Sequence, residues 1–211
     1  MLRWIRTLCL CCATVNAHAA LVEDVFSLQV EVKDAQQRVH QHQITVTVFR
    51  DDPREKAPFL VLNHGRAGDA AGRAALGRAR YDANAAWFVQ RGFAVFVPTR
   101  IGYGVTGGPD LEDAGACANR HYTPVFDIAA AQSVTVIQYA KSLPYVNGER
   151  GLLVGQSVGG ATTVALTAQN LPGVQGAINF AGGAGGNPIR WPENPCSPEA
   201  LGNTYAAYGK A

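Results

Sequence analysis

A serine set among glycines is the residue of this 211-residue chain best suited to chemistry. The sequence GQSVG at residues 155–159, with Ser157 at its centre, follows the apolar run 151–154 and precedes the small-residue run 160–166. This order predicts a strand, a tight turn and a helix. A G-x-S-x-G sequence in that setting is typical of a nucleophile elbow. The chemistry that it predicts is acyl transfer through a covalent serine intermediate.

The glycines around Ser157 are expected to have a packing role. Gly155 and Gly159 would keep side chains out of the space where strand and helix meet, and Gly160 would let the helix pack closely. The backbone N–H of Val158 would form one half of an oxyanion hole, at a helix N-terminus whose dipole favours negative charge. An incidental serine in a glycine-rich turn is disfavoured by the strand and helix around it, and a phosphate-binding loop by the lack of a following lysine.

A second short motif, NHGR at residues 63–66, ends another predicted strand. Its loop is expected to supply the other half of the oxyanion hole, with the backbone N–H of Arg66 as the donor and Gly65 beside it. His64 is the obvious candidate for a catalytic base. In His-Gly pairs of this kind the imidazole usually holds the loop through hydrogen bonds, so we predict a structural role for His64.

The roles of the other polar candidates are predicted from the sequence around them. Arg100 lies in a glycine-rich loop, where bracing the neighbouring backbone is a commoner role for one arginine than binding a substrate carboxylate. His40 and His42 are expected in solvent, within a polar turn. His121, near Cys117, is the remaining histidine that could approach the site as a substitute base.

The pattern of apolar residues predicts the elements that carry these motifs. Alternating polar and apolar residues at 26–32 and 44–48 predict two antiparallel strands around a polar turn at 34–43. After them, apolar runs typical of strands buried on both faces alternate with helical stripes. We therefore expect an α/β fold: a three-layer sheet, mostly parallel with an antiparallel N-terminal start, its C-terminal strands missing because no strand pattern follows Phe180. The later strands are predicted at 59–62, 93–97, 152–154 and 174–180, and the helices at 81–89, 125–143 and 160–166.

Residues 1–19 are expected to be a secretory signal peptide. Arg3 and Arg6 give a positive start, residues 8–15 are apolar, and the AHA at 17–19 has the form of a cleavage site. The apolar stretch falls well short of the ~20 residues that span a bilayer, which disfavours an anchor helix, and the usual lipobox of a lipoprotein is lacking. We expect a single domain at 20–211 in a periplasmic or secreted protein, with no contact with membranes beyond export.

Without the leader the chain carries 16 basic and 16 acidic residues. No basic patch stands out, which argues against nucleic acid and anionic membranes as partners. Two cysteines remain, Cys117 and Cys196, and export favours a disulfide between them over two free thiols. Such a bond would stabilise the fold by roughly 4 kcal/mol in the chain-entropy model. The sequence predicts no oligomeric state, although a sheet that ends at 174–180 would expose an edge prone to pairing or aggregation.

Taken together, the chain resembles the dienelactone-hydrolase-like branch of the α/β-hydrolases, in its exported bacterial form. The resemblance covers most of the chain after the leader and implies a cofactor-free serine hydrolase, with no metal, acting on a small-molecule ester, lactone or related acyl substrate. It also implies that Cys117 and Cys196 are joined. The stretches that carry the resemblance are HG at 64–65, RGFAVFVPTR at 91–100, GYG at 102–104, GQSVGG at 155–160 and NFAGG at 179–183.

The end of the chain departs from the family pattern. In α/β-hydrolases the nucleophile is followed by an acid and then by a histidine. The sequence after Ser157 has no histidine and no aspartate, and its two glutamates, Glu193 and Glu199, lie in a proline-rich tail. We therefore expect a nucleophile without its base, in a chain that is the N-terminal part of a longer hydrolase and is inactive or nearly so as given. A natural inactive form, acting as a non-catalytic binding protein, is the alternative.

Overall fold

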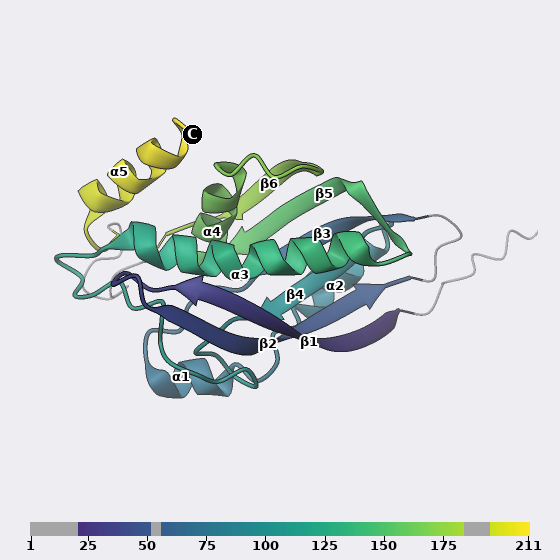
Figure 1. The fold of residues 1–211 in the computed structure, drawn as a ribbon, viewed down its shortest axis with the longest axis horizontal. Coiled ribbons are helices and arrows are strands. Elements are labelled where there is room, and N and C mark those ends of the chain that lie inside the picture. The colour runs from purple at the N-terminus through teal and green to yellow at the C-terminus, as the bar shows by residue number, and fades with distance from the viewer. Residues whose placement is uncertain (1–20, 52–55, 184–194) are drawn as a thin grey trace, which may run out of the picture.

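The structure is a computed structural model that describes residues 21–51, 56–183 and 195–211. The predicted signal peptide and Glu193 lie outside the described residues. Within them, six strands form one sheet with helices on both faces (Figure 1), as the sequence predicts. The elements are β1 Val22–Lys33, β2 Val39–Arg50, β3 Ala57–Asn63, α1 Ala70–Ala75, α2 Asp82–Val89, β4 Ala94–Thr99, α3 Tyr122–Ser142, β5 Val146–Gln156, α4 Val158–Thr167, β6 Val174–Phe180 and α5 Pro198–Tyr208.

The strand order of the sheet is β1-β2-β4-β3-β5-β6. Strands β1, β2 and β4 are antiparallel neighbours, whereas β4, β3, β5 and β6 run parallel, so the predicted antiparallel start of a mostly parallel sheet is confirmed. Helices α3 and α4 cover one face with one apolar cluster, and α2 covers the other face with a second. At the carboxyl ends of the neighbouring strands β3 and β5, Asn63 lies opposite Gly155. This pairing brings the loop at 64–66 beside the turn at Ser157.

The first hairpin differs from the sequence prediction. The polar segment 34–43 is not one turn, because β1 runs to Lys33 and β2 starts at Val39. His40 and His42 therefore lie in β2, where His40 Nε2 is 2.8 Å from an oxygen of Asp34 and His42 Nε2 is 3.0 Å from the Thr106 carbonyl. The prediction of a turn at these residues is wrong, and both side chains are half-buried rather than fully in solvent. An antiparallel strand can place polar side chains along one solvated face, so polarity alone does not mark a turn.

The Asp34 carboxylate organises the shortened turn. It accepts the backbone N–H groups of Gln36 and Arg38, each at 2.9 Å, and side-chain hydrogen bonds from Arg38 and His40. These bonds, that of His40 first, lower the pKa of Asp34 far below its usual range. A carboxyl group of this kind contributes stability above its unfolded pKa of about 3.9 and loses that contribution as the pH falls toward the folded value.

We expect Asp34→Asn to lower the melting temperature at pH 6, because the variant loses the bonds to the charged carboxylate. The difference from the wild type should shrink steadily below about pH 4, where the wild-type carboxyl group also becomes protonated on unfolding. Circular dichroism melts between pH 6 and 2.5 measure this. Asp113→Asn is the matched control, since Asp113 accepts the Gly115 N–H in another turn. A difference that stays constant with pH would contradict the argument.

Helix α5 is fixed to the rest of the fold through α3. The predicted disulfide between Cys117 and Cys196 is present, and the Tyr122 hydroxyl donates to the Cys196 carbonyl. The ring of Tyr205 stacks on Phe126. The 11-residue helix α5 is therefore tied to the N-terminal half of α3.

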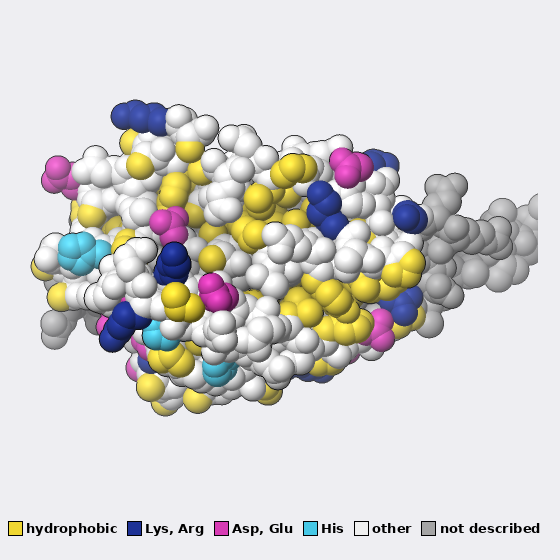
Figure 2. Space-filling model, viewed as in Figure 1, with side chains coloured by type: hydrophobic (Ala, Val, Ile, Leu, Met, Phe, Trp, Pro, Cys, Tyr) yellow, Lys and Arg dark blue, Asp and Glu magenta, His cyan; other side chains and the backbone are white. Residues whose placement is uncertain are grey.

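The surface carries two further features. Strand β6 is an edge of the sheet, as the sequence predicts, and leaves Ile178 and Phe180 exposed. Figure 2 shows acidic and basic side chains scattered over the face that it presents. No helix in the described ranges is long and apolar enough to cross a membrane, and no group of metal-ligating side chains gathers in the same ranges.

Candidate active site

Ser157 stands at a sharp turn between β5 and α4. Its backbone has φ 55° and ψ −125°, a conformation that side-chain-bearing residues seldom adopt. The neighbouring glycines make the turn possible. A Cβ on Gly155 would lie 2.0 Å from the Gly159 carbonyl oxygen, and one on Gly159 would lie 2.2 Å from the Asn63 carbonyl oxygen. Gly160 is also crowded, since its Cβ would lie 2.4 Å from Asn179 Oδ1. The strand, turn and helix thus have the expected geometry.

The Ser157 side chain is partly exposed and does not cap α4. Its hydroxyl donates a long hydrogen bond, 3.4 Å, to the Gly183 carbonyl. The backbone is held tightly, because Ser157 N–H donates to the Phe180 carbonyl at 2.9 Å and the Ser157 carbonyl accepts from Gly183 N–H at 3.3 Å. The strained conformation is therefore fixed by the loop after β6, while the residue remains partly exposed.

The loop at 64–66 lies directly beside the serine. A Cβ on Gly65 would come within 3.3 Å of the Ser157 Cβ. Within the described part of the chain, the backbone N–H groups of Val158 and Arg66 have no protein acceptor, whereas Gly65 N–H donates to the Tyr81 hydroxyl at 3.3 Å. Two free donors near a serine hydroxyl are what an oxyanion hole requires. Sequence reasoning did not identify Tyr81 as part of the site. Its left-handed φ of 53° is visible only in the structure.

His64 is fully buried and both of its ring nitrogens are used. Nε2 accepts the backbone N–H of Arg100 at 3.2 Å, and Nδ1 lies 2.7 Å from the Gly65 carbonyl. A backbone amide can only donate, so Nε2 carries no proton and Nδ1–H donates. Burial, followed by the nearby Arg100 charge, lowers the pKa of His64 well below its usual value. A neutral imidazole with both nitrogens bonded holds the loop, which is the role that the sequence predicts.

Arg100 braces the backbone from within the core. Its guanidinium donates to the His64 carbonyl at 2.8 Å and to both oxygens of Glu112, at 2.5 and 3.1 Å. Glu112 also accepts the Tyr103 hydroxyl at 2.8 Å. Burial and then the Glu112 charge raise the pKa of Tyr103. Glu112 was not identified from the sequence, because an acidic residue in a glycine-rich loop ordinarily lies in solvent.

A second carboxylate holds the side chain of Arg66. Asp110 accepts two hydrogen bonds from the Arg66 guanidinium, at 2.6 and 2.8 Å, and contacts Arg73 at 3.0 Å. The Arg66 hydrogen bond is the main cause of a lowered pKa at Asp110. Sequence reasoning did not identify this pair, whose members are 44 residues apart.

The remaining candidates for a base lie elsewhere. His121 precedes α3 with its side chain exposed, and it lines a separate cavity of about 470 Å³ with Gln36 and Asp113. Glu199 lies in the first turn of α5, also exposed. In the described ranges no imidazole or carboxylate is hydrogen-bonded to Ser157 Oγ.

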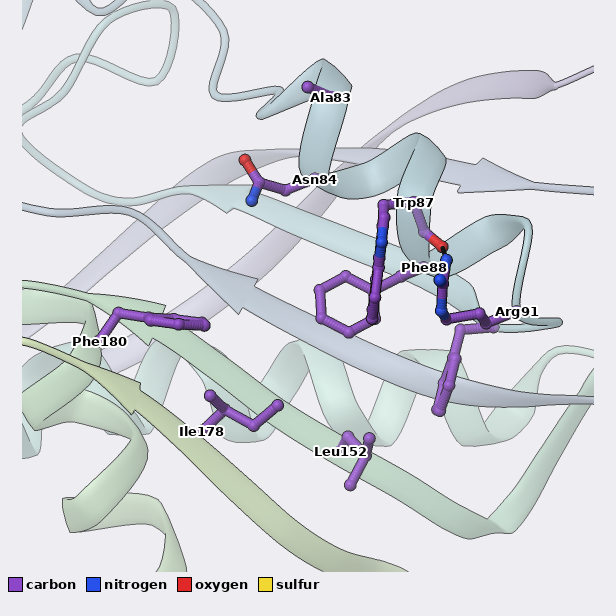
Figure 3. Close-up of a pocket in the computed structure, with 9 residues that line it drawn as sticks. Ala83, Asn84, Trp87, Phe88, Arg91, Leu152, Ile178 and Phe180 are labelled. Carbon is purple, nitrogen blue, oxygen red and sulfur yellow. Dashed lines mark hydrogen bonds between the residues drawn. The ribbon is translucent and has the colours of Figure 1, made fainter.

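An apolar groove of about 550 Å³ lies between α2 and the strands β5 and β6 (Figure 3). Trp87 and Phe88 project into it from α2, opposite Leu152 and Ile178. Phe180 lines the groove, and its carbonyl accepts the Ser157 N–H, so one end of the groove adjoins the turn. Ser157 itself does not line the groove.

A mostly parallel sheet with helices on both faces and a strained serine between strand and helix define the α/β-hydrolase fold. Solved structures share this fold. The α/β hydrolase GrgF from Penicillium sp. sh18 aligns with a TM-score of 0.52 and 20% identity, over 79% of this chain and 50% of that one. Acetyl xylan esterase 1 from Thermoanaerobacterium sp. JW/SL YS485 aligns with a TM-score of 0.51 and 15% identity, over 89% of this chain and 67% of that one.

The family follows from the sequence match. The family model for dienelactone hydrolases matches residues 73–202, a range that includes Ser157, Asp110, Glu112 and both cysteines. The chain therefore belongs to the dienelactone hydrolase family. No curated protein matches the sequence. The chain spans half the length of the Penicillium protein.

Proposed function

We propose that this protein is a serine hydrolase that cleaves a small-molecule ester, lactone or related acyl compound through an acyl-enzyme at Ser157. The strained Ser157 backbone supports this most strongly, because such strain persists only where the surrounding structure holds it, and it presents a partly exposed hydroxyl. The family membership supports the same class of reaction. The disulfide and the leader-like first residues support an exported protein.

In the proposed reaction Ser157 Oγ attacks the acyl carbon and the carbonyl π electrons move to the oxygen. The N–H groups of Val158 and Arg66 stabilise that oxyanion, and the alcohol or lactone oxygen then leaves with a proton. Attack requires a base that takes the hydroxyl proton, and no described side chain is placed to do so. We propose that the 211-residue chain alone retains at most the ~10³–10⁴-fold acceleration that binding and an oxyanion hole provide.

A non-catalytic binding protein is the second candidate. The apolar groove between α2 and β6 favours it, because the groove is lined without Ser157 and has the size of a small-molecule site. In that case the turn at Ser157 would be a structural remnant with no chemical role.

A fluorophosphonate probe distinguishes the two. Serine displaces fluoride at phosphorus, forming the O–P bond and releasing fluoride and a proton, so a competent elbow becomes labelled. We expect slow labelling over hours that peptide mass spectrometry locates at Ser157 alone and that Ser157→Ala abolishes. Labelling within minutes would show that the chain contains a base. Complete absence of label on folded protein would contradict the hydrolase proposal and support the binding protein.

A further inference from the structure

Residues of the segment 99–112 hold the loop at 64–66 at both of its ends. Arg100 bonds the carbonyl and the imidazole of His64. Asp110 bonds the guanidinium of Arg66 through two parallel hydrogen bonds. Every residue of the proposed oxyanion loop except Gly65 is therefore tied to one neighbouring segment.

The contact of Asp110 with Arg66 is the most direct of these ties. A bidentate arginine–carboxylate pair fixes direction as well as distance, because two parallel bonds prevent rotation. The Arg66 side chain is only 11% exposed and that of Asp110 is 25% exposed. The Tyr103 hydroxyl lies 3.5 Å from the same guanidinium. A side chain held in this way restricts the backbone that carries it, including the Arg66 N–H.

The charges around Asp110 strengthen this contact. Asp110 lies between two cations, Arg66 and Arg73. Exposed ion pairs contribute little to stability, typically ~0–1 kcal/mol, but a bidentate arginine–carboxylate pair within a network of charges is an exception. The bidentate pair therefore stabilises this segment and at the same time fixes the direction of the Arg66 side chain.

We propose that Asp110 is a positioning residue for the oxyanion hole, holding the Arg66 N–H toward Ser157 through its bidentate pair with the Arg66 side chain. Asp110 does not touch the acyl group. This inference rests on the proposed function, since it assigns a purpose to a donor that the proposed reaction uses. Asp110 lies outside both the serine turn and the 64–66 loop.

Backbone order at Arg66 tests the proposal without relying on activity. On ¹⁵N-labelled full chain, the Arg66 amide should have an order parameter near ~0.85 in the wild type and below ~0.6 in Asp110→Asn. Arg73→Gln removes the other cation and should leave the Arg66 amide rigid. Asp24→Asn, which breaks a remote ion pair with Arg50, is the second control. A rigid Arg66 amide in Asp110→Asn would overturn the proposal.

Labelling of Ser157 by the fluorophosphonate, with imidazole added as base, is the second readout. We expect Asp110→Asn to slow labelling by about tenfold, a part of the ~10²–10³ that a lost oxyanion donor costs, while both controls are labelled at the wild-type rate.

A more mobile Arg66 amide with an unchanged labelling rate would overturn the link to the oxyanion hole. If Ser157 of the wild type is not labelled, the proposed function fails. The order parameter of the Arg66 amide then decides by itself whether Asp110 holds the loop. If Asp110→Asn does not fold, Arg66→Lys replaces it, because lysine keeps the charge without the bidentate fork.

Discussion

Replacing Glu112 by glutamine is expected to destabilise the protein by about 3–5 kcal/mol, the usual cost of leaving a buried charge without its partner. Arg100 and Glu112 are 0% and 1% exposed, so the Arg100 guanidinium would remain in the core with the neutral glutamine amide and the His64 carbonyl beside it and no counter-charge. The variant should also loosen His64, whose carbonyl and imidazole both depend on Arg100. For a chain of this size the melting temperature should fall by roughly 6–20 °C.

Thermal and urea denaturation followed by circular dichroism measure this loss. Glu23→Gln is the matched control. Like Glu112, Glu23 accepts hydrogen bonds from arginine, here from Arg78 and Arg80, but it lies at the surface. Little change is expected there, since exposed ion pairs are screened by water and salt. Equal losses in the two variants would contradict the view that burial gives the Arg100–Glu112 pair its importance.

The fold could be predicted because its signals are local. The runs at 59–62 and 93–97 are apolar on both faces, and the structure buries β3 and β4 at the centre of the sheet. The helical stripe at 125–143 likewise became α3, with Gln132 as a polar member that accepts the Ile101 N–H. The extent of the turn at 34–43 was predicted wrongly, since polar contacts between the turn and the strand, such as that of Asp34 with His40, leave no periodic pattern in sequence.

The residues of the candidate site also differ in whether a local sequence pattern identifies them. The G-x-S-x-G motif between a strand and a helix can be recognised from a short stretch of sequence. The structure places Ser157 as that pattern predicts. The residues that support the 64–66 loop could not be found in this way. Asp110 meets Arg66 across 44 residues and Glu112 meets Arg100 across 12, and neither carboxylate differs in sequence from a solvated one. Their roles depend on burial and pairing, which only the folded chain defines.

Imidazole added to the solution is expected to accelerate fluorophosphonate labelling of Ser157 by at least about tenfold. A positioned general base contributes ~10²–10⁴-fold to such reactions, and a free base should recover a part of that. The Ser157 side chain is partly exposed, and its hydrogen bond to the Gly183 carbonyl is long enough, at 3.4 Å, to be exchanged for one to imidazole. The carbonyl cannot accept the proton at neutral pH, whereas the neutral imidazole can.

The pH dependence makes the measurement specific. Acceleration should rise between about pH 6 and 8, as added imidazole loses its proton. It should vanish in Ser157→Ala and be unchanged in His121→Asn, because His121 lines a separate cavity. Labelled peptide quantified by mass spectrometry against time gives the rate. If labelling of the wild type is already fast without imidazole, and His121→Asn slows it, the chain contains its own base and the proposed incompleteness of the catalytic set is wrong.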